Sequence, residues 1–523
     1  MKWYLPVLVT IAAIVVVSLS AASAEAEYDY FDEGDFSYEI VDGEAYVVGL
    51  ASGAQGDIVI PATVTHNDVV YNVTAITGYL YSHEVTSLTL GKNIEEIPIG
   101  GFQMDGLEAI NVPVENDYFA SLDGVLFTKN MRTLIKYPDS KADTSYTVPG
   151  SVSSLESYSF EYTSVESITL NDGLVRVGVM AFYGNDNLTH INSDTQPDAF
   201  PKSVAIIGDF AFNGCVSLTT FELYEGMEFI GTYAFSETAI TTMDIPGSIT
   251  TIGEGAFSYC TNLTKFISGL TYNDHYDVID DVLYDFDHST LISFPCAKTC
   301  DEGKFVFPET VRKISAGAFS GTVSLKEVVL NKGLTTIDYA AFMRSSIETI
   351  NLDHITYIDS YAFNGCKNLK NVQFSSRLYY IGGSAFGSSG LESIELTEGL
   401  VDIEPAVFSG CNNMKTATFN KACSVEVPYH TFWNCLSLKA IYIEGYDVTF
   451  DIDSLNIGLS EETHATVDVY TKNGYSLPSN VADENTTVIV HEEGKGPYPY
   501  ENLIGVAFCV ILIIAILAFV REV

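Results

Sequence analysis

Positively charged residues are scarce in this sequence. Its 523 residues include 25 lysines and arginines against 68 aspartates and glutamates, and the net charge of −43 is spread along the whole chain. Nucleic acid and anionic lipid are therefore poor partners for the bulk of the protein, because like charges repel and no basic stripe is present. Such a charge suits solubility and mutual repulsion at a crowded cell surface. Alternatively, the acidic charge could serve to bind cations, or it could reflect a salt-rich habitat.

Sequence motifs for catalysis are also missing. The patterns G-x-S-x-G and H-E-x-x-H and a phosphate-cradling glycine loop do not occur, and the nine histidines are scattered. Acidic pairs such as Asp280-Asp281 lack the spacing of a calcium-binding loop, and a solvated hairpin edge explains them better. The sequence therefore predicts no enzyme activity, no metal site and no cofactor.

Long apolar runs are absent between the two ends of the chain. Hydrophobic residues make up 47% of the sequence, yet 40 glycines and many serines and threonines interrupt them at close intervals. This punctuation is typical of β-rich proteins. A chain of this length exceeds one compact core, so several domains or a repeat array are expected.

The two ends resemble export and membrane segments. Lys2, an apolar stretch and the small residues Ala22-Ser23-Ala24 predict a cleavable signal peptide over residues 1–24, in preference to a permanent anchor. An uncharged run of 18 residues, 503–520, can cross roughly 27 Å of hydrocarbon and predicts a transmembrane helix. Because Arg521 follows, residues 521–523 are expected in the cytoplasm and the ectodomain outside the cell, as in a single-pass membrane protein.

A phenylalanine that follows a small residue recurs along the chain, and this periodicity is the strongest signal in the sequence. Most successive members are 21 to 24 residues apart, and alanine precedes the phenylalanine in most units. The series is Phe160, Phe182, Phe212, Phe235, Phe257, Phe319, Phe342, Phe363, Phe386, Phe408 and Phe432.

Two further apolar patterns complete each unit. The segments IETINL from Ile347 and LESIEL from Leu391 end in alternating apolar and polar residues, which predicts one short strand per unit. After a turn, pairs such as Ile252-Gly253 and Ile358-Asp359 add a third apolar position. A unit this small cannot close a core alone, so we expect stacked units that form a solenoid with a parallel strand ladder.

The composite pattern resembles the BspA-like, or treponemal-type, leucine-rich repeat family. The segments Cys260–Phe266 and Ile245–Phe257 match the family pattern well, and the resemblance covers about residues 57–443. It implies a β-rich leucine-rich-repeat solenoid with about 22–24 residues per repeat. It also implies an extracellular or surface-exposed protein that adheres to host components, matrix or other cells.

The interruptions of the repeat suggest hairpin-bearing variants near residues 118–149 and 276–308. Both contain two β-rich runs joined by a short polar turn, as in Asp123–Phe127 followed by Leu134–Pro138. The expected organisation is an N-terminal β cap over 25–75, the solenoid over 76–443, a C-terminal β cap or small β module over 444–491, and a linker over 492–502.

The cysteines of the exported chain admit two interpretations. Five of them lie three residues after a repeat phenylalanine, which favours buried, reduced packing residues, with the neighbours Cys411 and Cys435 as the pair to test for a disulfide. A local disulfide between Cys296 and Cys300 is also plausible. Possible N-glycosylation sites are Asn72, Asn187, Asn262 and Asn485.

Exposed strand positions are the expected recognition surface, and their mainly acidic character favours a basic or cationic partner. They are Glu166, Thr169, Glu222, Asp244, Glu348, Asn351, Gln373, Glu392, Glu395 and Tyr442. The leading hypothesis is a cell-surface protein that binds extracellular proteins or glycans. The alternative is a structural spacer or surface-coat component without a dedicated ligand. In that case the lateral contacts between copies of the protein would matter more than any ligand.

Overall fold

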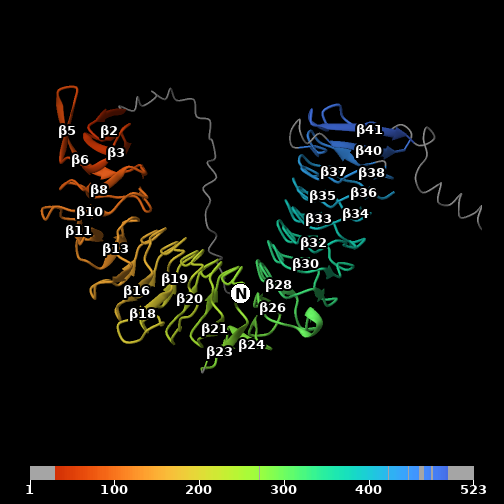
Figure 1. Ribbon diagram of the computed structural model, residues 1–523, viewed down its shortest axis with the longest axis horizontal. Helices are drawn as coiled ribbons and strands as arrows, with labels where there is room; N and C mark the ends of the chain where they lie inside the picture. Colours follow the sequence, from red (N-terminus) through yellow and green to blue (C-terminus); the bar gives the residue numbers. More distant parts are fainter. Residues whose placement is uncertain are drawn as a thin grey trace, which may run out of the picture.

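The chain forms a U-shaped solenoid of stacked β turns (Figure 1). The computed structural model describes residues 30–269, 271–421, 423–445, 447–458, 465–472 and 475–492. The solenoid predicted from the repeat is confirmed. The predicted signal peptide and the predicted helix over 503–520 lie outside the described residues. Within the described ranges, no helix has the length and apolar character needed to cross a membrane.

One ladder of parallel strands is built from the segments in which apolar and polar residues alternate. Its strands are β4 (Gly56–Val59), β8 (Val85–Thr89), β10 (Ala109–Asn111), β14 (Ser145–Thr147), β16 (Ser167–Leu170), β18 (His190–Ser193), β21 (Thr242–Ile245), β23 (Lys265–Ser268), β27 (Lys304–Val306), β29 (Glu327–Val329), β31 (Thr349–Ile350), β34 (Ser393–Leu396), β36 (Thr416–Phe419), β38 (Ala440–Ile443), β40 (Ala465–Thr471) and β41 (Thr486–Glu492). Figure 1 shows β16, β18, β34, β36 and β38 on the outer side of the U, so we call it the outer ladder.

A second parallel ladder of two-residue strands faces the opening of the U, as β19, β20, β33 and β35 show in Figure 1. This inner ladder comprises β7 (Leu80–Tyr81), β9 (Phe102–Gln103), β15 (Ser154–Leu155), β17 (Arg176–Val177), β19 (Ile206–Ile207), β20 (Phe229–Ile230), β22 (Thr251–Ile252), β28 (Lys313–Ile314), β30 (Thr336–Ile337), β32 (Tyr357–Ile358), β33 (Tyr380–Ile381), β35 (Asp402–Ile403), β37 (Glu426–Val427) and β39 (Thr449–Phe450). The sequence predicted one strand per unit, and this was wrong, because units of the solenoid also contribute a strand to the inner ladder. The inner strands were missed since two residues are too few to show an alternating pattern.

Antiparallel strands interrupt the solenoid in three places. At the N-terminus, β1 (Tyr30–Glu33), β2 (Phe36–Val41), β3 (Glu44–Leu50), β6 (Val69–Ile76) and β5 (Thr63–His66) form a five-stranded sheet. Two three-stranded meanders consist of β11 (Phe119–Leu122), β12 (Val125–Thr128) and β13 (Thr133–Lys136), and of β24 (Tyr276–Ile279), β25 (Val282–Asp285) and β26 (Thr290–Ser293). The single-turn 3-10 helix η1 (Asp301–Gly303) follows the second meander.

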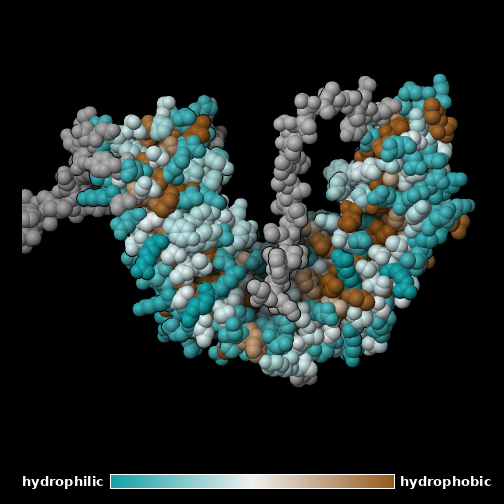
Figure 2. Space-filling model, turned by 180° about the vertical axis from the view of Figure 1, so that it is seen from behind, coloured by the Kyte–Doolittle hydropathy of each residue, from teal (hydrophilic) through white to brown (hydrophobic). Residues whose placement is uncertain are grey.

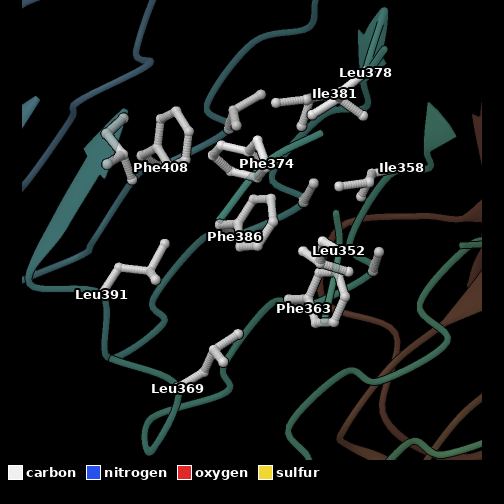
Figure 3. Packing of buried hydrophobic residues seen from close by; sticks show 14 of the residues in the cluster. Leu352, Ile358, Phe363, Leu369, Phe374, Leu378, Ile381, Phe386, Leu391 and Phe408 are labelled. Carbon is white, nitrogen blue, oxygen red and sulfur yellow. The ribbon is translucent and has the colours of Figure 1, made fainter. Parts of the chain in front are cut away.

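The repeat phenylalanines stack in the core. Phe363 lies between Phe342 and Phe386 with ring centroids 5.4 and 5.0 Å away and nearly parallel planes, and Figure 3 shows Phe363, Phe386 and Phe408 in successive turns. The hairpin variants continue these stacks, because Tyr137 and Phe294 stack on the first phenylalanine of the following block at 5.0 Å. Each ring is buried, so the stack removes a large apolar area from water.

Turns with left-handed backbone flank each phenylalanine. In the unit of Phe363, Tyr361 has φ +59° and Gly365 has φ +73°, and the same two positions are left-handed in most other units. Between them, the Phe363 N–H donates to the Ala385 carbonyl of the next unit at 2.7 Å. Val407 and Thr431 accept the equivalent hydrogen bond at 2.9 and 3.1 Å, so this bond joins successive units whether or not alanine precedes the phenylalanine.

Candidate binding surface

The binding residues expected from the sequence lie on or beside the outer ladder. Ladder register continues from Glu395 on β34 through Thr418, Tyr442 and Tyr470 to His491 on β41. We call these five residues the outer row. Its last rings stack, with Tyr442 and Tyr470 centroids 5.1 Å apart and Tyr470 and His491 centroids 4.8 Å apart. The outer row therefore ends in an aromatic stack that the sequence pattern did not reveal.

The remaining expected residues are distributed along the solenoid and are not brought together in one site. Thr169 lies in register with Thr147 and Asn192 in the N-terminal half of the ladder, three residues after the exposed Glu166. Gln373 is exposed in the C-terminal arm, whereas the partly buried Asn351 is tied by two hydrogen bonds to the backbone of Leu330.

A lysine neutralises one of the expected acidic residues, Glu392. The backbone N–H groups of Glu348 and Glu392 donate to the carbonyls of Lys326 and Lys370 in the preceding units, at 2.7 and 2.9 Å. In the next unit, Lys415 Nζ binds Glu392 Oε2 at 2.8 Å, and this contact lowers the pKa of Glu392. The negative charge expected at Glu392 is therefore compensated by Lys415.

Glu222 and Asp244 do lie in an acidic hollow of the outer side. The hollow has a volume of about 430 Å³ and is also lined by Phe221, Tyr224 and Glu225. Partial burial raises the pKa of Asp244, and the charges of Glu222 and Glu225 add to that effect. Among the residues that the structure describes, no group of three or more His, Cys, Asp or Glu side chains is placed to hold a metal ion.

The inner ladder of the C-terminal arm and the residues that flank its strands present a cluster of aromatic side chains that the sequence analysis missed. We call it the tyrosine patch, and it consists of Tyr339, Tyr357, Tyr361, Tyr379 and Tyr380. Tyr357 and Tyr380 stack with centroids 4.6 Å apart and planes 8° apart, and Tyr379 lies 6.0 Å from Tyr357. Tyr339 and Tyr361 meet edge to face at 5.7 Å. The signal was the repeated Tyr-Ile pair at the inner strands, which becomes visible only when the units are aligned.

Hydrophobic residues gather on the inner side of the N-terminal arm, which is on the right in Figure 2. In this arm, a hollow of about 220 Å³ is lined by Ile97, Ile99, Phe102 and Phe119. The deeply buried Lys136 also borders it and pairs with Asp139 at 2.6 Å. The inner sides of the two arms therefore differ in the side chains they present, since the N-terminal arm has apolar residues there and the C-terminal arm has tyrosines.

The repeat cysteines are buried thiols that donate to a carbonyl of another turn. Cys411 Sγ donates to the Phe386 carbonyl at 3.1 Å, and burial raises the pKa of this thiol to about 11. Cys296 and Cys300, considered as a disulfide, are both free in the structure. Cys296 Sγ is buried and donates to Ser320 O at 3.2 Å, whereas Cys300 is half-buried before η1. Cys435 is also a free, buried thiol.

The possible glycosylation sites differ in exposure. Asn72, Asn187 and Asn262 are exposed, whereas Asn485 is partly buried and donates to Asp483 Oδ2 at 3.3 Å. Modification at these residues stays a prediction.

The repeats match a known family. Six copies of the region described as "BspA type Leucine rich repeat region" match within residues 139–198, 195–277, 290–415 and 347–451, which together span more than half of the chain. The sequence matches no curated protein.

One solved structure shares the fold, and two others resemble the chain less closely. A leucine-rich repeat protein from Eubacterium ventriosum superposes with a TM-score of 0.55 at 22% identity, over 69% of this chain and 95% of that chain. The pneumococcal vaccine antigen PcpA matches with a TM-score of 0.44 at 17% identity, over 88% of this chain and 98% of that one. A leucine rich cell surface protein from Faecalibacterium prausnitzii matches with a TM-score of 0.41 at 20% identity, over 80% and 95% of the two chains.

Proposed function

Because the chain belongs to the BspA-type leucine-rich repeat family, we propose that it is a cell-surface scaffold that binds extracellular proteins or glycans. The fold is that of a leucine-rich repeat scaffold, which typically serves interaction and not catalysis. The observation that carries the proposal is the outer row, in which five strands present side chains in continuous register and end in an aromatic stack. Aromatic side chains are enriched where binding energy concentrates.

We also propose that residues 1–24 direct export and that residues 503–520 anchor the chain in the membrane, with the solenoid outside the cell. The support is the sequence itself, namely the small-residue cleavage site and the uncharged run followed by Arg521.

The test is a binding screen of the full chain against extracellular matrix proteins and glycans at physiological salt. We expect saturable binding that is lost when Glu395→Lys and Tyr442→Ala are combined, because both side chains belong to the outer row. Glu228→Lys is the matched control, since this exposed glutamate lies beside the inner ladder and its reversal changes the charge equally. No saturable binding, together with ordered self-association, would support the surface-coat alternative instead.

A further inference from the structure

The tyrosine patch combines exposed ring faces with unneutralised carboxylates. Tyr379 is 49% exposed and Tyr361 is 39% exposed. Tyr380 Oη donates to Glu404 Oε1 at 2.6 Å, and the Gly383 N–H donates to Glu404 Oε2 at 3.0 Å. This carboxylate is therefore fixed beside the stacked rings.

Asp359 supplies a second negative charge to the patch. Partial burial raises the pKa of Tyr339 and Tyr357, and the Asp359 charge raises both further. Strands β30, β32, β33 and β35 contain no lysine or arginine, and the nearest cation of the inner ladder, Lys313 on β28, is paired with Asp338 at 3.2 Å. The strands of the patch therefore present aromatic faces and carboxylates, and the exposed Arg377, two residues before Tyr379, places a cation at the edge of the patch.

We propose that the tyrosine patch is a docking surface for a lysine- or arginine-bearing segment of a partner protein. This inference rests on the proposed binding function and names the kind of partner and the place where it docks. An ammonium or guanidinium group is attracted both to the face of an aromatic ring and to a neighbouring carboxylate.

The net charge of the chain and two cation–π contacts within it favour a cationic partner over a neutral glycan. The chain carries a net charge of −43, so the field around the patch draws cations toward it. The protein also places its own cations over tyrosines, with Lys202 Nζ 5.3 Å from the ring centre of Tyr224 and the Arg344 guanidinium 5.8 Å from that of Tyr259. A neutral sugar would gain nothing from the net charge.

The test uses substitutions that leave the net charge unchanged. A fluorescent peptide of Arg-Gly-Gly repeats is titrated with the full chain at physiological salt, and its anisotropy is followed. The double variant Tyr361→Ser/Tyr379→Ser removes two exposed rings of the patch. The matched control, Tyr162→Ser/Tyr272→Ser, removes two exposed rings elsewhere, which are 61% and 76% accessible. Thermal unfolding of each variant verifies that it folds.

We expect the patch variant to bind the peptide roughly tenfold more weakly, because each cation–π contact contributes a modest but measurable share of the affinity. The control variant should bind as tightly as the parent chain. Equal weakening by both variants, or by neither, would overturn the proposal, because the attraction would then be diffuse. Binding of neutral maltohexaose that is lost only in the patch variant, with peptide binding unchanged, would assign the patch to glycans and overturn the cationic partner.

The two proposals fail in different ways. If the binding screen yields an extracellular ligand and the peptide titration shows no effect of the patch variant, the patch assignment fails and the scaffold function stands. If the screen yields no saturable ligand but the patch variant alone loses the peptide, the scaffold function fails and the cation preference of the patch stands.

Discussion

At the scale of single residues, burial decides the chemistry of the cysteines. A thiol reacts as its thiolate, so a buried group with a raised pKa is inert near neutral pH. Cys411 has both properties, since it is buried and its pKa is raised to about 11. Cys300 is only half-buried, which leaves its sulfur more accessible to reagents. The difference is directly testable.

We predict that iodoacetamide at pH 8 alkylates Cys300 well before Cys411 in the native full chain. Peptide mapping by mass spectrometry measures the two rates, and denaturation in urea should equalise them because both thiols then face water. If Cys296 and Cys300 were both protected until a reductant is added, the local disulfide would exist after all.

Glycines at the end of the inner strands limit how closely successive units can stack. A Cβ atom at Gly253 would lie 2.2 Å from the backbone nitrogen of Thr232, so the units would have to separate. Gly253→Ala should therefore lower the thermal midpoint and cost about 1–3 kcal/mol, as overpacking does. Gly150→Ala is the control, because its Cβ would meet no atom within 4 Å. Equal midpoints for the two variants would show that the units can separate freely.

At the scale of elements, the phenylalanine stack links neighbouring units of the solenoid. Phe363→Ala removes a fully buried ring between two stacked neighbours, and we expect a loss of about 3–5 kcal/mol. Hydrogen exchange should rise in the units next to Phe363 while the N-terminal core around Phe36 stays protected, because a solenoid unit contacts mainly its neighbours. Phe286→Ala, at a ring that is 43% exposed, serves as the control. A uniform rise in exchange along the chain would argue against this local coupling.

The sequence predicts some elements better than others for physical reasons. Segments such as LESIEL from Leu391 alternate over enough residues to reveal a strand, and β34 lies there. Inner strands such as Tyr357–Ile358 have only two residues, so neither the strand nor its partly exposed tyrosine was apparent. Lys415, which pairs with Glu392, belongs to the next turn, so this ion pair could be found only from the register of the stacked units. The left-handed turns were missed because residues such as Tyr361 and Arg344 occupy positions where glycine is the usual signal.

At the scale of the whole molecule, the net charge of −43 opposes the stacking of units. Screening weakens this repulsion, since the Debye length falls from about 30 Å at 0.01 M salt to about 8 Å at 0.15 M. We predict that the thermal midpoint of the full chain rises between these two sodium chloride concentrations. A fall would mean that favourable pairs such as Lys415–Glu392 outweigh the repulsion in stability.

The proposed membrane anchor of the whole molecule depends on the uncharged run over residues 503–520. An arginine at the centre of a membrane-spanning helix costs about 2.5–3.5 kcal/mol on insertion, which is a large penalty for a run of only 18 residues. Ile514→Arg should therefore move a substantial part of the chain into the soluble fraction after alkaline carbonate extraction, whereas Ile514→Val should leave it with the membranes. If the arginine variant stayed with the membranes as fully as the parent, the anchor would have to lie elsewhere. The surface location in our proposal would then need a different basis.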